Sequence, residues 1–349
     1  MSVEAVPAAA RRRIRALVVA AALVAATAGA CSSSSAAEST SREGISGDRL
    51  VVVTTVAPIT SIAAAVIGDR ADIEGIVPEG TNSHTFEPPP STAELLSTAD
   101  VLFLNGLQLE EPTRELAETN RKAGSVIVEL GAETVTEDQY RYDVSFPEEA
   151  GKPNPHLWTN PPMVKTYGEI LRDTMVDEDP ANAAAYRANF EVFAAKVDQL
   201  DAAMRASFDS IPTEKRKLLT YHDAYAYFAE EYGWSVVGAI QVADFGDPSP
   251  REIADLVEQV EREGVGAIFG SEVFPSPVLE QIGRETGVRY VDVLRDDDLP
   301  DEPGRGEHSL IGLLRFDYLT MTEALGGDAS PLHQLDVSIP TPDQARYPQ

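Results

Sequence analysis

The fold is decided by the stretch PANAAAYRANFEVFAAKVDQLDAAMRASFDSI, residues Pro180 to Ile211. Its large apolar residues recur every three or four positions, which places them on one helical face; they are Tyr186, Phe190, Phe193, Val197, Leu200, Met204, Phe208 and Ile211. Asp179 can cap this helix, Pro180 suits its first turn, and Pro212 ends it. At about 1.5 Å per residue the helix would be roughly 45 Å long, more than one small domain needs. We therefore expect it to join two lobes.

The segments on both sides of this helix follow one plan, in which short β-branched strands alternate with helices. The first strand is LVVVTTV, Leu50 to Val56, an apolar run typical of a strand buried in a parallel sheet. The alternation predicts parallel strands joined by helical crossovers. We expect an α/β protein with two (β/α)4-type lobes, each with a parallel sheet, bridged by one long rigid helix and separated by a cleft.

The predicted elements can be placed along the chain. Before the long helix, strands are expected at 50–56, 72–77, 101–104 and 125–130 and helices at 59–67, 92–98 and 112–123. After it, strands are expected at 217–220, 235–240, 266–269 and 289–294 and helices at 224–232, 249–263, 277–286 and 309–325. The divisions are an N-terminal lobe at 48–178, the linking helix at 179–212, a C-terminal lobe at 213–327 and a loose tail at 328–349.

The N-terminus has the pattern of an export signal. Arginines precede an apolar run, Ala16 to Ala26, that is too short to span a bilayer. Small residues then lead to Cys31, the only cysteine, which cannot form an internal disulfide. The arrangement resembles a bacterial lipoprotein signal, so we predict a signal peptide at 1–30, lipidation of Cys31 and a flexible Ser- and Ala-rich tether at 31–47. The alternative is ordinary secretion with an incidental cysteine.

The composition is strongly acidic, with a formal net charge of −29. Nucleic acid needs a basic surface, so it is excluded as a partner. Acidity would attract cations weakly, but solubility outside the cell explains it equally well, and the charge selects no ligand.

Three of the five histidines lie where predicted strands should end. His84 follows the strand at 72–77, His156 lies in NPHLW before the long helix, and His222 follows the strand at 217–220. Ligands gather at the carboxyl ends of strands in open α/β sheets, so two facing lobes would direct all three imidazoles into one cleft.

Acidic residues end the last predicted strand at the same rim; they are Asp296, Asp297 and Asp298. Three imidazoles and one carboxylate would form a closed four-coordinate site of the kind that suits zinc. Taken singly, each histidine is more simply a surface or hydrogen-bonding residue and the acidic run a solvated turn; their shared position favours the site. His308 and His333 fit no strand end, and we assign them to the surface.

Several strings together resemble one family; they are NSHTFEPPPSTAELLSTADVLFLNGLQLE, NPHLW, LLTYHDAYAYFAEEYG, AIFGSEVFPSPVLEQI and VDVLRDDDL. In this order they are similar to the zinc- and manganese-binding solute-binding proteins of metal ABC importers, the TroA-like group or bacterial solute-binding protein family 9. The resemblance runs from about Leu50 to Leu325. It implies two α/β lobes bridged by one long helix, a metal held between them, and lipoprotein anchoring.

The resemblance also implies a ligand set. By motif position the metal ligands would be His84 (H-x-[FY]-E-P), His156 (P-H-x-W), His222 (H-D-A-[FY]) and Asp297, the middle residue of DDD. The family has serine-aspartate-serine at that last position, so Asp296 and Asp298 leave its register open.

The choice of metal depends on where the chain departs from its relatives. Manganese-selective relatives often have a glutamate at the position of His222, and nitrogen-rich coordination favours Zn²⁺ over Mn²⁺. The loop from Gly131 to Asn154 lacks the histidines of some zinc-specific members. Outer groups should orient the imidazoles; the candidates are Glu87, Asp223 and Glu272, each of which could equally be a cap or a surface charge.

The predicted function is a lipid-anchored extracytoplasmic receptor, a monomer without enzyme activity, that captures Zn²⁺, or alternatively Mn²⁺, for an ABC permease. The sequence has no G-x-x-x-x-G-K-[ST] motif, so the ATPase must be another subunit. Three alternatives stay open. One is a protein that binds a metal chelate such as haem, a siderophore or a cobalamin. Another is a zinc-dependent hydrolase, which would keep one coordination position for water. The third is an additional attachment role at the cell surface.

Overall fold

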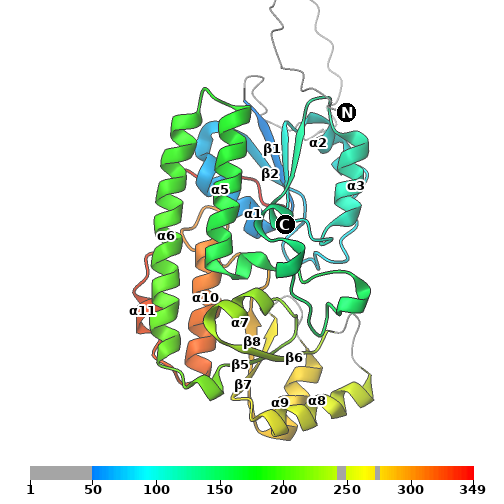
Figure 1. The fold of residues 1–349 in the computed structure, drawn as a ribbon, viewed down its shortest axis with the longest axis vertical. Helices are drawn as coiled ribbons and strands as arrows, with labels where there is room; N and C mark the ends of the chain where they lie inside the picture. Colours follow the sequence, from blue (N-terminus) through cyan, green and yellow to red (C-terminus); the bar gives the residue numbers. More distant parts are fainter. Residues whose placement is uncertain (1–48, 242–248, 272–275) are drawn as a thin grey trace, which may run out of the picture. The chain divides into compact units, whose positions relative to one another are not determined.

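The computed structural model describes residues 49–241, 249–271 and 276–349. These residues form two four-stranded parallel sheets with helices around them, which confirms the predicted α/β class (Figure 1). Within these ranges no helix is both long and apolar enough to cross a bilayer. The predicted signal peptide, the tether, Cys31 and Glu272 lie outside the described residues.

The first sheet has the strand order β2-β1-β3-β4, and all its pairs are parallel. Its elements are β1 (Val51–Thr54), α1 (Ala57–Ile67), β2 (Asp72–Gly75), α2 (Thr92–Thr98), β3 (Val101–Leu104), α3 (Glu111–Asn120), β4 (Val126–Glu129) and the short α4 (Leu130–Thr134). Alternate strand residues face opposite sides. Val51 and Val53 pack with α2 and α3, whereas Val52 packs on the side of α1. The sheet is therefore covered on both faces, as its continuous apolar strands indicate.

The second sheet repeats this arrangement with the order β6-β5-β7-β8. Its elements are β5 (Lys217–Thr220), α7 (Ala226–Tyr232), β6 (Ser235–Ala239), α8 (Pro250–Glu263), β7 (Ala267–Ser271), α9 (Pro277–Thr286), β8 (Arg289–Leu294) and α10 (Leu310–Ala324). One face packs on α8 and α9 through Val260, Leu279 and Ile282. The predicted strands and helices thus exist, with bounds that differ by a few residues.

The linking helix is α6 (Ala183–Asp209), and it contacts α1 of the first lobe and α10 of the second (Figure 1). All of the apolar residues predicted for its inner face are buried. Its start differs from the prediction, because Asn182 occupies the N-cap position. Asp179 accepts hydrogen bonds from Asn182 Nδ2 and Tyr186 Oη, both at 2.7 Å, and so fixes the turn before the helix.

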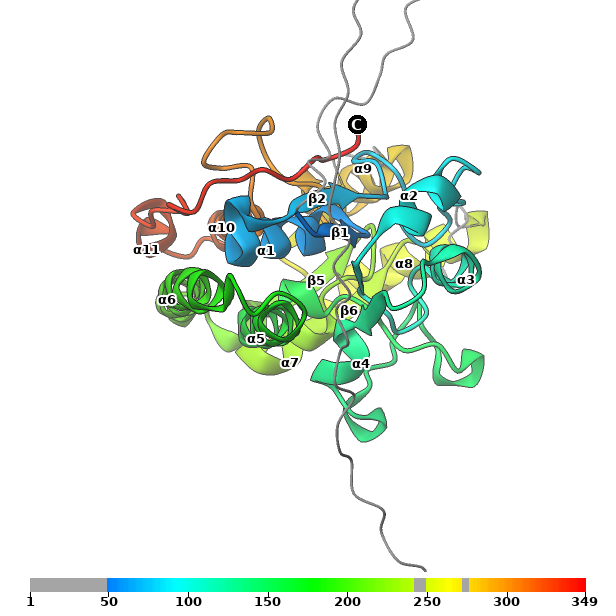
Figure 2. The same cartoon turned by 90° about the horizontal axis from the view of Figure 1, so that it is seen from above.

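A second long helix, α5 (Pro161–Glu178), lies alongside α6 and is not among the helices predicted from the sequence (Figure 2). It begins after Asn160, whose side chain accepts a hydrogen bond from Met163 N. Gly168 permits the close approach of the two helices, because a Cβ there would lie 2.8 Å from the ring of Phe193. Helix α5 thus packs on α6, which is the helix that contacts both lobes.

The two lobes share one apolar core. A single cluster of buried side chains runs from Val52 and Phe103 in the first sheet, through α5 and α6, to Phe269 in the second sheet and Leu313 in α10. The described residues accordingly fall in one compact unit. Because close-packed interiors resist deformation, wide hinge motion between the sheets would disrupt this core.

The C-terminal tail is not loose, and the expectation for residues 328–349 is wrong. After the short helix α11 (Ser330–His333), it runs beside α1 to the edge of the first sheet at β2 (Figure 2). There Arg346 N donates to Ile73 O and Arg346 O accepts from Gly75 N, both at 3.0 Å. Polar and proline-rich composition suggested mobility, but these long-range backbone bonds are invisible in the sequence.

The shared core predicts a sharp contrast between neighbouring residues of α6. We expect Phe193→Ala to lower the free energy of unfolding by about 3 to 5 kcal/mol, because it removes a buried ring between the helices. Val192→Ala, at a 37% exposed position of the same helix, should change it by less than about 0.5 kcal/mol. Urea unfolding measures both, and equal effects would contradict a core shared through α6.

Candidate metal centre

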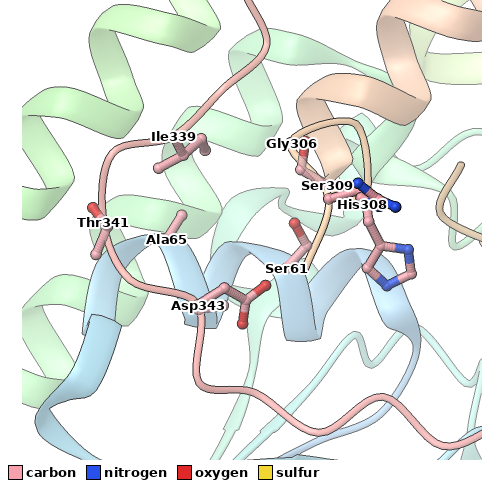
Figure 3. A pocket seen from close by; sticks show the side chains of 10 residues that line it. Ser61, Ala65, Gly306, His308, Ser309, Ile339, Thr341 and Asp343 are labelled. Carbon is pink, nitrogen blue, oxygen red and sulfur yellow. The ribbon is translucent and has the colours of Figure 1, made fainter. Parts of the chain in front are cut away.

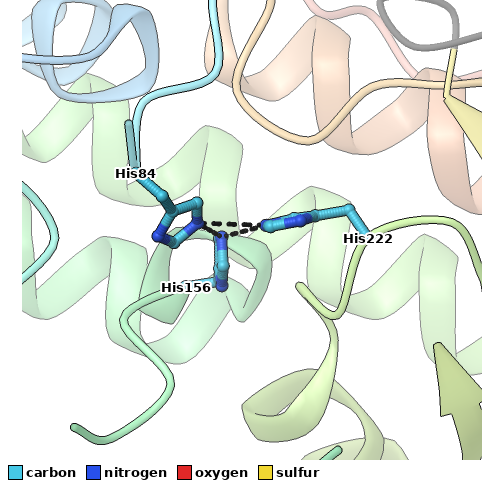
Figure 4. A group of neighbouring side chains, drawn as sticks. All are labelled: His84, His156 and His222. Carbon is cyan, nitrogen blue, oxygen red and sulfur yellow. Dashed lines mark hydrogen bonds between the residues drawn. The ribbon is translucent and has the colours of Figure 1, made fainter. Parts of the chain in front are cut away.

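Three loops bring the predicted histidines together. His84 lies in the loop after β2, His156 precedes α5, and His222 follows β5 directly. Figure 4 shows the three rings pointing toward one another. The Nε2 atoms of His84 and His156 are 3.1 Å apart, those of His84 and His222 3.1 Å, and those of His156 and His222 2.9 Å. The strand-end argument therefore located residues that meet, although they are far apart in the chain.

The surroundings of the three imidazoles favour their neutral form. His156 and His222 are buried and His84 is half-buried. Burial first, then the nearby His222 and Lys152, holds the pKa of His84 well below the usual 6.5. Burial first, then the other two imidazoles, does the same for the pKa of His156. Burial lowers the pKa of His222 to about 4, against the hydrogen bond that its ring donates to Gln241 Oε1. Near neutral pH each ring therefore keeps a nitrogen lone pair free, as metal coordination requires.

Two side-chain amides orient the rings. His156 Nδ1 lies 2.7 Å from Asn154 Oδ1, and His222 Nδ1 lies 2.6 Å from Gln241 Oε1. The Nδ2 group of Asn154 donates to Asp143 Oδ2 and to Asp223 O, both at 2.7 Å, so its oxygen must face His156. An amide oxygen accepts a hydrogen bond from Nδ1–H, so the proton stays on Nδ1 and the lone pair is on Nε2, facing the other rings.

The sequence suggested carboxylates, not amides, as the groups that orient the imidazoles. Glu87 is exposed, and Glu272 lies outside the described residues. Asp223 is fully buried, but its Oδ2 accepts from Ser145 N at 3.2 Å and its carbonyl accepts from Asn154, so it supports His156 only through Asn154. The strand-end rule could have identified Gln241, since this amide comes soon after β6.

Asp297 lies beside the histidines, but the compact four-residue cluster is not formed. Among the described residues, the ligand atoms that all lie within 4.8 Å of one another belong to the three histidines. Asp297 and Asp296 line a small cavity with His84 and His222. Asp298 is engaged elsewhere, because both its oxygens accept from Gly80 N at 2.9 Å. Of the three aspartates, Asp296 and Asp297 line the cavity with the histidines, and Asp298 does not.

The electrostatics of Asp297 are unusual. Burial of its carboxyl group and the neighbouring Asp298 raise its pKa to about 8, while a hydrogen bond from Ser83 acts in the opposite direction. The Nε1 of Trp158 donates to Asp296 O at 2.8 Å, which fixes the backbone of this segment against the loop of His156. A cation in the adjacent cavity would favour the ionised form of Asp297.

A buried network inside LNGLQLE supports the loop of His156. Asn105 Nδ2 donates to Pro155 O at 2.9 Å, and Asn105 Oδ1 accepts from Tyr167 Oη at 2.7 Å. Glu110 accepts from Thr55 Oγ1 at 2.8 Å and from Asn105 N at 2.6 Å. Burial raises the pKa of Glu110 to about 7, against these bonds. Asn105 and Glu110 belong to a quoted string, but nothing in the sequence assigned them this role.

The remaining two histidines differ in their exposure to solvent. His333 is exposed and its Nε2 lies 2.8 Å from Glu323 Oε1, as a surface residue should. His308 is buried, which contradicts its assignment to the surface. Its ring meets the edge of Tyr347, with 4.8 Å between ring centroids, because the C-terminal tail covers it.

Two α/β lobes with parallel sheets, bridged by α6 and converging on three clustered imidazoles, define a metal-binding solute receptor. The family described as ZnuA, zinc-uptake complex component A, periplasmic, matches residues 52–324, and the chain belongs to this family. Members are the metal-binding substrate receptors of ABC importers.

Known relatives bear different metals in their names. The chain is 29% identical over 253 residues to the iron-binding protein YfeA of Yersinia pestis, covering 72% of this chain and 79% of that protein. It is 28% identical over 279 residues to the manganese-binding lipoprotein MntA of Halalkalibacterium halodurans, covering 80% and 89%. The periplasmic zinc-binding protein TroA of Treponema pallidum has the same fold, with a TM-score of 0.72 at 23% identity over 79% of this chain and 99% of that one.

Removing the amide that orients His222 should weaken metal binding. We expect Gln241→Ala to lower the affinity for Zn²⁺ by about 10- to 100-fold, because the ring loses the acceptor for its Nδ1 proton. Gln241→Glu keeps an acceptor oxygen and should bind more tightly than the alanine variant. Isothermal titration calorimetry measures both affinities. Equal weakening in the two variants would show that the acceptor is not what matters.

The raised pKa of Asp297 predicts proton release if this residue coordinates the metal. At pH 7 a carboxyl with a pKa of about 8 is mostly protonated, whereas His222, at about 4, is neutral. Binding of Zn²⁺ should then release close to one proton, and affinity should rise nearly tenfold per pH unit between about pH 5 and 7. Asp297→Asn should abolish the release. Calorimetry in buffers of different ionisation enthalpy counts the protons, and a wild-type protein that releases none would argue against Asp297.

Proposed function

We propose that this protein is an extracytoplasmic receptor that captures a divalent transition-metal ion, Zn²⁺ in preference to Mn²⁺, and delivers it to an ABC permease driven by a separate ATPase subunit. The observation that carries the proposal is the convergence of three Nε2 atoms within 3.1 Å of one another. In this proposal His84, His156 and His222 bind the ion, and Asp297 supplies the fourth ligand from the adjacent cavity.

The preference for zinc rests on the donor atoms. Three neutral imidazoles supply nitrogen, which suits zinc, whereas manganese is better matched by carboxylates and other oxygen ligands. Names of relatives mention iron, manganese and zinc, so membership alone does not decide the metal. The Nε2 separations are close to those of nitrogens that each lie about 2.0 to 2.1 Å from one zinc ion.

Anchoring belongs to the same proposal. A lipid on Cys31 and the tether at 31–47 would hold the receptor at the outer surface of the membrane, next to the permease. Relatives such as MntA are named lipoproteins, which supports this placement.

A hydrolase needs consideration because three histidines with an open fourth position are also the ligand pattern of catalytic zinc. Such a site requires room for a substrate. The cavity beside His84, His222 and Asp297 holds about 10 Å³, which is about the space of one water molecule. Capture of a bare ion fits this space, and a substrate does not.

A chelate is disfavoured for the same reason. Sites for drug-sized molecules have volumes of roughly 300 to 1,000 Å³. The other cavity that reaches His84, lined also by Phe146 and Lys152, has a volume of about 100 Å³. Haem or a siderophore would need a much wider opening between the lobes.

The metal affinity of single histidine variants should show which histidines are ligands. We expect the wild-type protein to bind one Zn²⁺ per chain and to prefer it to Mn²⁺ in competition, and His156→Ala to lose more affinity than the roughly 100-fold that an orienting residue can cost. His333→Ala changes an exposed histidine and should bind as the wild type does. Equilibrium dialysis with metal analysis measures all three. Unchanged binding by His156→Ala, or preference for Mn²⁺, would overturn the assignment.

A further inference from the structure

The loop that carries His84 is tied directly to the segment that carries the acidic rim, across the two lobes. Gly80 N donates to both carboxylate oxygens of Asp298 at 2.9 Å. In the opposite direction, Leu299 N donates to Glu79 Oε1 at 2.8 Å. Each lobe thus supplies one carboxylate and one backbone N–H. We call this reciprocal pair of contacts, made by Glu79, Gly80, Asp298 and Leu299, the interlobe clasp.

The C-terminal tail holds the clasp from outside. Glu79 N donates to Pro348 O at 3.2 Å, and Gln349 Nε2 donates to Glu79 Oε2 at 3.0 Å. Glu79 is therefore bound by the tail at its backbone and at one oxygen, and by the second lobe at the other oxygen. Just before, Arg346 forms a parallel bridge with Glu74 of β2, which fixes the base of the same loop.

The tail is anchored along its whole course. We call residues 334–349 the strap. Lys196 Nζ of α6 donates to Asp336 O and to Asp336 Oδ2, both at 2.9 Å. Further along, the strap passes so close to the end of α1 that a Cβ at Gly68 would lie 2.7 Å from Thr341 Cγ2. Figure 3 shows Thr341 and Asp343 beside α1, with His308 on the far side of a cavity of about 60 Å³.

The clasp lies where the site would have to open. His156 and His222 are buried on rigid supports, whereas His84 is half-buried on a loop without regular structure from Ile76 to Ser91. The shared core opposes separation of the sheets. An ion can therefore enter or leave most easily by displacement of the His84 loop from the segment of Asp297, and that displacement breaks the clasp.

We propose that the interlobe clasp, held by the strap, is the gate of the metal site, and that Glu79 is the positioning residue that sets its opening rate. This rests on the proposed function. Weakening a gate raises the open population with and without metal, so association and dissociation both accelerate while the dissociation constant changes less. Loss of a ligand, in contrast, weakens binding itself.

The test compares Glu79→Ala and Glu79→Gln with Glu302→Ala, which removes the same charge from an exposed position in the second lobe. Stopped-flow fluorescence can follow Zn²⁺ binding and its removal by a chelator, because the ring of Trp158 packs 5.0 Å from that of His156. We expect Glu79→Ala to raise both rate constants by on the order of ten- to a hundredfold. Glu79→Gln keeps an acceptor for Leu299 N and should restore most of the slow exchange, and Glu302→Ala should match the wild type.

Hydrogen exchange of the metal-free protein provides a readout that does not need metal. The amides of Gly80 and Leu299 should exchange faster in Glu79→Ala than in the wild type, with thermal unfolding confirming that the variant folds. Gln349→Ala should shift both measurements in the same direction by a smaller factor. If the wild type binds no metal, the proposed function fails while exchange still judges the clasp. Unchanged rates in Glu79→Ala, or faster release with unchanged association, would overturn the gate.

Discussion

The structure depends on one electrostatic constraint: three imidazole rings, two of them buried and one half-buried, have their Nε2 atoms about 3 Å apart. Three imidazolium ions could not share this space, because both desolvation and mutual repulsion oppose their charges. Each ring is neutral near pH 7, because its pKa is lowered below the usual 6.5. In His156 and His222 the Nδ1–H points away from the other rings and donates a hydrogen bond to Asn154 and Gln241, respectively. Much of the surrounding network serves to hold these acceptors in place.

The fold holds two of the three histidines on rigid parts of the molecule. His156 sits between α5 and the Asn105 network, and His222 follows β5, whose Leu218 and Leu219 are buried in separate apolar clusters. A core that continues through both sheets leaves the loops as the parts that can move. Of the three clustered histidines, His84 lies on the irregular loop from Ile76 to Ser91, which the clasp holds through Glu79 and Gly80. The same topology therefore holds His156 and His222 in place and leaves the loop of His84 able to move.

The sequence was informative where local pattern determines structure. Apolar periodicity placed α6 and most strands, and the tendency of ligands to gather at strand ends selected His84, His156 and His222 from the five histidines. Contacts between distant segments were not predictable in this way. The pairing of Arg346 with β2 depends on the path of the tail, and the burial of His308 depends on Tyr347.

The motif predicted the position of Asp297 only approximately. Its spacing placed it at the same rim as the histidines, and it lines a cavity with His84 and His222 without joining their compact cluster. The amide Gln241 was missed for a different reason: outer groups were sought among carboxylates, whereas a neutral oxygen satisfies the Nδ1 proton as well. Helix α5 was missed although its apolar residues have helical spacing.

The use of amides behind two of the imidazoles has a thermodynamic consequence. A carboxylate behind a histidine raises the basicity of the coordinating nitrogen and strengthens its bond to a metal. The amides of Asn154 and Gln241 are uncharged and polarise the rings less. Donor strength is thereby moderated without any change in the number or direction of the donors. Such weaker donors suit reversible binding, because a receptor that bound its ion as tightly as a structural zinc site would release it too slowly to pass it on.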